Sequence, residues 1–167
     1  MAKPGRAAYM PAMATATLYS RDILRLAASI PHVGRLADPQ GSAEKRAPVC
    51  GSTVAVDVKL DEAGRIAALG QQVRACAFGQ ASAALMGRHA IGRSAAELAA
   101  AHDALAAYLS GARDDPGDWP GLELFAEARR LTARHGAILL PFAAAAAATL
   151  EAQERTRRPS ERQHLPG

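Results

Sequence analysis

A run of alternating apolar residues constrains the fold of this chain more than any other feature. Every second position of the run is apolar: Val54, Val56, Val58 and Leu60. A period of two is typical of a β-strand with one buried face and one solvated face. The next four residues, 61–64, read Asp-Glu-Ala-Gly and predict a turn, and residues 65–74 predict a weaker returning strand. We therefore expect a β-hairpin at the centre of the fold.

Helical patterns precede and follow the hairpin. Ser20 is a suitable N-cap for a short amphipathic helix that Pro31 ends. Residues 77–89 predict a helix that packs through small side chains. The segment 94–97, Ser-Ala-Ala-Glu, is a capping box and predicts a further helix that ends at Gly111.

The last third of the chain predicts two more helices. One covers residues 122–131, and a long Ala-rich helix runs from Ile138 to about Arg155, with Pro141 in its first turn. Residues 32–48 and 111–121 are rich in Gly, Pro and charge, and we expect both to be irregular loops.

Composition agrees with a small helical core around a short sheet. Ala fills 41 of the 167 positions and aromatic residues make up only 4% of the chain, so small aliphatic side chains on helices must form most of the core. The length fits one globular domain. We expect an α+β fold in which helices pack on one face of a small antiparallel sheet.

The ends of the chain differ from its centre. We expect a disordered leader over residues 1–17, one domain over 18–155, and a basic flexible tail over 156–167. The basic residues near the C-terminus are Arg155, Arg157, Arg158 and Arg162. Without interleaved aromatic residues these arginines indicate a solvated end rather than a nucleic-acid site.

Several protein classes are excluded or disfavoured by the same sequence. No window approaches the roughly 18 uninterrupted apolar residues of a membrane span. The Pro- and Gly-containing start does not form the apolar region of a secretory signal. Two cysteines cannot build a disulfide-rich scaffold. We expect a cytoplasmic protein with no membrane partner.

Cys50 and Cys76 stand at the entrance and exit of the predicted hairpin, whose outer ends should lie close together. The N-terminus of the following helix favours a thiolate at Cys76, the form that binds metal. His135, before the last helix, is a third candidate. Both cysteines have the alternative of packing as small core hydrophobes, and His135 that of a surface or capping residue. The spacing alone therefore predicts either a thiol or metal site or a purely structural role.

Three segments resemble motifs of one known family. Residues 47–52, Ala-Pro-Val-Cys-Gly-Ser, resemble an N-P-x-C-G-D segment that precedes a strand. Residues 76–83 resemble a cysteine followed by a small-residue helix with an Ala-Ser pair, and 92–98 resemble a K-G-K-S-x-x-E turn into the next helix. These motifs belong to the iron–sulfur cluster assembly scaffolds of the IscU, SufU and NifU N-terminal type. The resemblance covers residues 18–151.

The resemblance implies a function and a set of ligands. Members of the family are scaffolds rather than enzymes: they have a three-stranded sheet, receive sulfur from a cysteine desulfurase, assemble a [2Fe–2S] cluster on three cysteines and deliver it to apoproteins. Some members bind zinc at the same site. Cys50 and Cys76 fall on two of the cysteine positions, and His135 falls on a histidine position of the IscU branch. The resemblance thus implies Cys50, Cys76 and His135 as ligands of iron or of the cluster.

Two positions depart from the family pattern. Ser52 replaces an aspartate, and a hydroxyl is a weak ligand for iron or zinc. Gly136 replaces the third cysteine. A [2Fe–2S] cluster takes four ligands, and this chain offers three, so the fourth comes from a second subunit of a homodimer, from a small thiol, or from nowhere. Two alternatives to a scaffold follow: a persulfide relay through the cysteines, and a metal-free module that binds the desulfurase.

Overall fold

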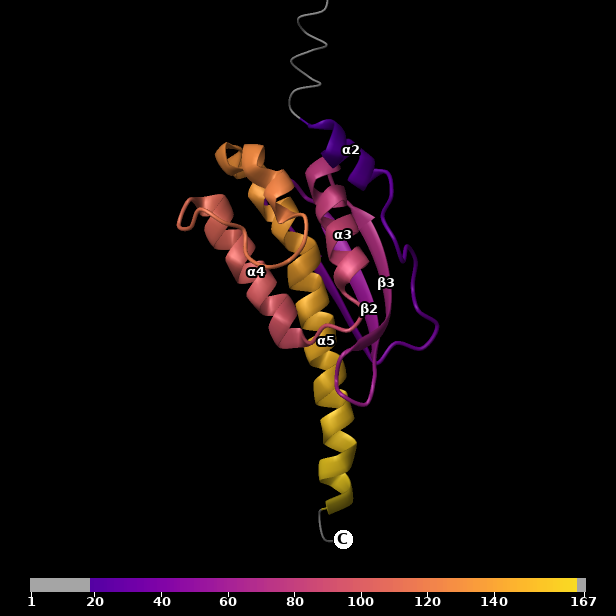
Figure 1. Cartoon of the computed structure of the whole chain (residues 1–167). Coiled ribbons are helices and arrows are strands. Elements are labelled where there is room, and N and C mark those ends of the chain that lie inside the picture. Colours follow the sequence, from indigo (N-terminus) through magenta and orange to yellow (C-terminus); the bar gives the residue numbers. More distant parts are fainter. Residues whose placement is uncertain (1–18, 165–167) are drawn as a thin grey trace, which may run out of the picture.

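Three antiparallel strands form the sheet of the computed structural model, which describes residues 19–164 and the side chains as far as residue 158. The strands β1 (Gly41–Arg46), β2 (Thr53–Leu60) and β3 (Ile66–Arg74) lie in the order β1-β2-β3. β2 and β3 form the predicted hairpin (Figure 1), and Val54, Val56 and Val58 are its buried row. The hairpin prediction is confirmed.

β1 lies inside the segment predicted to be an irregular loop, so that prediction was wrong for residues 41–46. The sequence of this strand, Gly-Ser-Ala-Glu-Lys-Arg, lacks an alternating apolar pattern because β1 is an edge strand with a largely exposed end. It contacts the core through the backbone of Gly41 and through the side chain of Ala43, which is partly buried. Gly41 packs so closely on the helix behind the sheet that a Cβ would overlap the carbonyl oxygen of Ala148.

The three helices predicted up to residue 111 are confirmed. They are α2 (Arg21–Ala27), α3 (Ala77–His89) and α4 (Ala95–Ser110). The Ser20 hydroxyl accepts a hydrogen bond from the Ile23 amide at 3.2 Å, and the Ser94 hydroxyl accepts one from Glu97. Gly111 ends α4 in a left-handed conformation with φ 87°.

The last third of the chain differs in detail from its prediction. Residues 122–130 form the 3-10 helix η1 (Leu122–Arg130) rather than an α-helix, and η2 (Thr132–Arg134) leads into α5 (His135–His164). Because α5 begins at His135, Pro141 lies in its second turn, where it cannot donate to the Ala137 carbonyl. The buried Ser82 hydroxyl donates to the neighbouring Ile138 carbonyl at 2.5 Å, which supplies a hydrogen bond beside the proline.

α5 also extends beyond its expected end near Arg155. The chain is helical as far as His164, and the Arg155 guanidinium pairs with Glu151 one turn earlier at 2.8 Å. Residues 156–164, expected to be a flexible tail, thus continue the helix. The expected leader, 1–17, lies outside the described residues.

Helices cover one face of the sheet in two layers (Figure 1). α5 packs on β1 and β2, α3 packs on β3 and on α5, and α4 lies on the far side of α5 from the strands. The core is one cluster that these elements share, rich in alanines of α3 and α5. This arrangement confirms the α+β class with helices on one face of the sheet.

The other face of the sheet is crossed by the segment before β1. Asp57 projects from this face and is 1% exposed. Its carboxylate accepts hydrogen bonds from the Arg35 guanidinium at 2.7 and 3.0 Å, from the Leu36 amide at 3.1 Å and from the Ser42 hydroxyl at 2.7 Å. Gly70 lies beneath this crossing, where a Cβ would be 2.7 Å from the Gly34 carbonyl oxygen. Asp57 therefore ties residues 35–36 to the sheet.

The region 132–158, mostly α5, contains an 18-residue window that is long and apolar enough to span a membrane by length and composition, with a mean hydropathy of 1.3. Within that window 56% of the residues are buried inside the fold. A buried core helix passes the same test, so this helix is weak evidence for a membrane span.

Candidate metal centre at the cysteine end of the sheet

Cys50 lies at the tip of a short turn between β1 and β2. This turn, residues 47–52, is called the cysteine loop below. It is closed by hydrogen bonds from the Ala47 amide to the Ser52 carbonyl and from the Gly51 amide to the Ala47 carbonyl, both 2.8 Å. Gly51 has φ 71°, a conformation that favours glycine. The loop leaves the Cys50 side chain exposed to solvent.

Cys76 lies two residues after β3, at the N-cap of α3, and is partly buried. Thr53 and Arg74 are partners across β2 and β3. Cys50 is three residues before this pair, and Cys76 is two residues after it. The hairpin therefore brings the cysteine loop and the start of α3 to the same end of the sheet.

The start of α5 is the third segment at this end. A Cβ on Gly136 would lie 3.4 Å from the Ala47 Cβ, and a Cβ on Gly79 of α3 would lie 3.3 Å from the Ala137 Cβ. The first turn of α5 thus touches both the cysteine loop and α3. We call the place where residues 47–52, Cys76 and residues 134–137 meet the cysteine end.

The surroundings of the Cys50 thiol favour its thiolate form. Burial raises its pKa, but the hydrogen bond with the Ser52 side chain, hydrogen bonds with the backbone of Ser52 and Cys50, and the charge of Arg134 together lower it below the ordinary 9.0. The Cys50 sulfur lies 3.1 Å from the Ser52 hydroxyl oxygen. A lowered pKa in an exposed thiol increases the population of the thiolate, which is both the nucleophile and the metal ligand.

His135 is held by η1 through one ring nitrogen. Nε2 lies 2.8 Å from the Ala128 carbonyl oxygen. A carbonyl only accepts, so Nε2 carries a proton in this bond, and in the neutral ring Nδ1 keeps its lone pair. Among the side chains that the structure describes, residues 19–158, however, no group of three His, Cys, Asp or Glu is placed to hold a metal ion. The fold collects the three segments at one end but does not converge the side chains of Cys50, Cys76 and His135.

Comparison with protein families decides the relationship. The model of the NifU-like N terminal domain matches residues 18–117. The chain belongs to this family. The crystal structure of a nitrogen-fixing NifU-like protein (N-terminal) from Brucella abortus is 35% identical and covers 84% of this chain and 97% of its own, with a TM-score of 0.77.

A second solved structure shows the same fold at lower identity. It is described as an iron–sulfur cluster assembly scaffold protein for the SUF system, from Fervidobacterium islandicum AW-1. It is 20% identical, covers 80% of this chain and 98% of its own, and has a TM-score of 0.73. Comparison with the curated proteins gives no match.

The residues that depart from the expected family pattern both lie at the cysteine end of this NifU-like chain. Ser52 is buried, and its hydroxyl contacts the Cys50 sulfur instead of supplying a carboxylate. Gly136 is exposed at the second position of α5. Sequence reasoning missed Arg134 and Arg46, whose charges lie near the cysteine loop. Their positions, next to His135 and before the loop, were the available signal.

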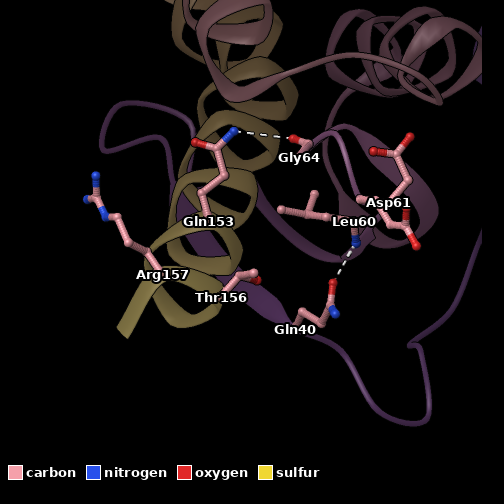
Figure 2. A pocket seen from close by; sticks show the side chains of 8 residues that line it. Gln40, Leu60, Asp61, Gly64, Gln153, Thr156 and Arg157 are labelled. Atoms are coloured by element: carbon pink, nitrogen blue, oxygen red, sulfur yellow. Dashed lines mark hydrogen bonds between the residues drawn. The ribbon is translucent and has the colours of Figure 1, made fainter. Parts of the chain in front are cut away.

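A cleft of about 240 Å³ lies away from the cysteine end in this NifU-like fold, between the β2–β3 turn and α5 (Figure 2). The Gln153 side chain donates to the Gly64 carbonyl at 3.2 Å, and the Leu60 amide donates to the Gln40 side chain at 2.6 Å. No cysteine or histidine is among the residues that line it. The cleft therefore has no soft metal ligand.

Proposed function

We propose that this chain is a scaffold on which an iron–sulfur cluster is assembled for transfer to apoproteins. The carrying observation is that an exposed, activated thiol, Cys50, shares one end of a NifU-like sheet with a second thiol, Cys76. The cluster is cargo, and its sulfur would come from a cysteine desulfurase. The fold of the Fervidobacterium scaffold protein agrees with this role. We place the protein in the cytoplasm, where free thiols stay reduced.

The residues of the cysteine end would have different tasks. Cys50 and Cys76 would bind iron through thiolates, the usual ligands of [2Fe–2S] clusters. The N-terminus of α3 offsets negative charge at Cys76. The Ala128 carbonyl fixes the tautomer of His135 and leaves Nδ1 able to bind metal. Zinc accepts the same sulfur and nitrogen donors.

The donor set fits a cluster only in part. Cys50, Cys76 and His135 offer at most three donors, whose side chains do not converge in this structure, against the four that a [2Fe–2S] cluster takes. The Ser52 hydroxyl is a poor ligand, and Gly136 has no side chain. A cluster held in this way keeps one position for a ligand from outside the chain, which favours easy release.

Anaerobic reconstitution with iron, sulfide and a small thiol tests the scaffold. Wild-type protein should gain visible absorption with equal amounts of iron and sulfide, and C50S and C76S should lose it. His135→Ala should weaken the cluster, whereas His102→Ala on the distant α4 is the matched control. Wild-type protein that stays colourless and holds no iron would refute the proposal.

A persulfide relay is the second candidate, because Cys50 is exposed and its pKa is lowered. The Cys50 thiolate would attack the outer sulfur of a desulfurase persulfide, form a new S–S bond, and release the desulfurase thiolate. Mass spectrometry after incubation with a desulfurase and cysteine should then show one added sulfur on Cys50 without iron. If Cys50→Ser gains sulfur as fast as the wild type, the relay is wrong. Desulfurase binding without sulfur or metal uptake would instead indicate a metal-free module.

A further inference from the structure

One side of α5, the long helix that runs the length of the fold, carries an apolar stripe that the rest of the fold leaves open (Figure 1). Its five residues stand at positions i, i+4, i+7, i+8 and i+11, so they lie on one face of the helix. The opposite side of α5 packs on the strands and is buried. Leu150 is 51% exposed, and the other members are partly exposed. The α5 stripe consists of Leu139, Ala143, Ala146, Ala147 and Leu150.

This stripe differs from the other exposed large apolar residues of the described chain. Val33, Val49 and Ile91 lie between helices and strands, and Leu24 lies on the short helix α2. Scattered exposed residues of this kind are normal on a protein surface. On α5 the exposed leucine continues into a row of apolar neighbours about 17 Å long. An apolar helix face of this kind packs against another surface.

The order of side chains along the stripe is nearly the same in both directions. A leucine stands at each end, and the residues between them are alanines, which let two helices approach closely. When two copies of α5 lie antiparallel, Leu139 meets the partner's Leu150, and Ala143 meets the partner's Ala146. A two-fold axis near residues 144–145 relates these contacts, so the same surface serves both copies.

The charges at the two ends of the stripe favour the same arrangement. The first turn of α5 contains no acidic residue, and a helix N-terminus carries partial positive charge. Glu154 lies one turn beyond Leu150, and within the described side chains no salt bridge engages it. Antiparallel packing places the partner's Glu154 beside this first turn. The neighbouring Arg155 already pairs with Glu151 of its own helix.

We infer that the α5 stripe is the contact surface of a symmetric homodimer in which two α5 helices pack antiparallel. This inference is independent of the proposed scaffold function. Along the helix axis the two copies of His135 lie about 28 Å apart, so each cysteine end stays open to other partners. Because the stripe is short, the dimer should be weak, with a Kd of about 10–100 µM.

Sedimentation velocity of the full chain, over a concentration series that brackets this Kd, tests the dimer. Wild-type protein should shift from monomer to dimer. Leu150→Asp should weaken the dimer at least about 30-fold, because each dimer loses two apolar contacts and would bury two charges. Leu24→Asp is the matched control, since Leu24 is 48% exposed on α2, and it should leave the dimer unchanged. Thermal unfolding verifies that both variants are folded.

Charge reversal tests the contact at the ends of the stripe. Glu154→Lys should weaken the dimer about three- to tenfold, because it places positive charge beside the partner's helix N-terminus. Glu62→Lys makes the same change of charge on the exposed β2–β3 turn and should have no effect.

Cross-linking tests the direction of packing. In a background of Cys50→Ser and Cys76→Ser, a short bis-maleimide should link L139C to L150C when the two variants are mixed. Neither variant should cross-link efficiently alone, because antiparallel packing holds identical positions about 17 Å apart along the axis.

Four results would overturn the inference: a chain that stays monomeric throughout the series, a dimer that L150D leaves unchanged, L150C that cross-links efficiently to itself, and a monomer that binds lipid instead. For the last, flotation with vesicles of phosphatidylcholine and phosphatidylglycerol is the measurement. Flotation that L150D abolishes would show that the stripe contacts a membrane surface. None of these results bears on cluster assembly, which reconstitution tests separately.

Discussion

Gly136→Cys adds a third thiol to the cysteine end, and the structure shows that the fold accepts it. A Cβ at this position meets only the Ala47 Cβ within 4 Å, at the ordinary contact distance of 3.4 Å. Gly136 is the second residue of α5 and is exposed. The new Cβ therefore needs no rearrangement of the backbone or of its neighbours.

The effect on folding should be small and favourable. Replacing glycine with cysteine in a helix gains about 0.3 kcal/mol, and burying part of the side chain against Ala47 adds about 0.5 kcal/mol. The free energy of unfolding should rise by less than about 1 kcal/mol, which shifts the unfolding temperature by about 1–3 °C. A thermal melt by circular dichroism measures this shift.

The effect on the cluster should be large. A ligand attached to the chain acts at an effective concentration in the millimolar range. G136C without added thiol should therefore form as much cluster as the wild type does at about millimolar thiol. Visible absorption after anaerobic reconstitution measures the yield, and transfer of iron to a chelator measures the lifetime.

Gly136→Ser is the matched control, since it has nearly the same size and helix effect but offers no thiolate. It should melt like G136C and still require added thiol. The reasoning fails if G136C melts as expected but depends on added thiol as strongly as G136S does.

Three further substitutions test the fold and the reactivity of the thiol. Asp57→Asn should lower the free energy of unfolding by about 2–3 kcal/mol. The loss is smaller than for a fully buried ion pair because the Arg35 side chain is half exposed and stays hydrated when its partner is removed. Burial raises the pKa of Asp57, but its hydrogen bonds with Arg35, Ser42 and Leu36 lower it below 3.8. The stability that this carboxylate contributes is therefore complete above about pH 5 and is lost as pH falls through the folded pKa. Urea unfolding should show that the gap in unfolding free energy between wild type and D57N narrows in acid. Gly41→Ala should lower the free energy of unfolding by about 2 kcal/mol or more because the new Cβ overlaps α5, whereas Gly136→Ala should not lower it. Equal unfolding temperatures for G41A and G136A would contradict this packing. Ser52→Ala should slow alkylation of Cys50 by iodoacetamide about two- to fivefold at neutral pH, with Cys76 as internal reference, and an unchanged rate would show that Ser52 does not activate the thiol.

The elements that the sequence predicts well are those whose own residues carry the signal. The alternation from Val54 to Leu60 is the pattern of a half-buried strand. Ser94 and Gly111 are helix caps, which act on backbone groups only a few residues away in the sequence. β1 carries no such signal, because its close contact with α5 depends on the absence of a side chain at Gly41 and not on an apolar side chain. Its place in the sheet depends on β2 and α5, which are distant in the sequence.

The candidate site shows the same division. Cys50 and Cys76 were found because they border a hairpin, whose ends meet by construction. The hydrogen bond of His135 to Ala128 was not predictable, since the 3-10 geometry of η1 decides where that carbonyl points. The arginines beside Cys50 were missed because the sequence alone does not show which charged side chains the fold brings close to this thiol.

The two thiols differ in mechanical freedom. Cys76 is anchored at the head of α3, and residues 78–79 and 81–87 of that helix are all buried. Cys50 sits on the crest of a turn, with the exposed Val49 before it and Gly51 after it. A cluster bound by both thiols would have one ligand on a buried helix, Cys76, and one ligand on an exposed turn, Cys50. Release would then proceed stepwise, with the bond to Cys50 opening first and the partially freed cluster presented to its recipient from Cys76.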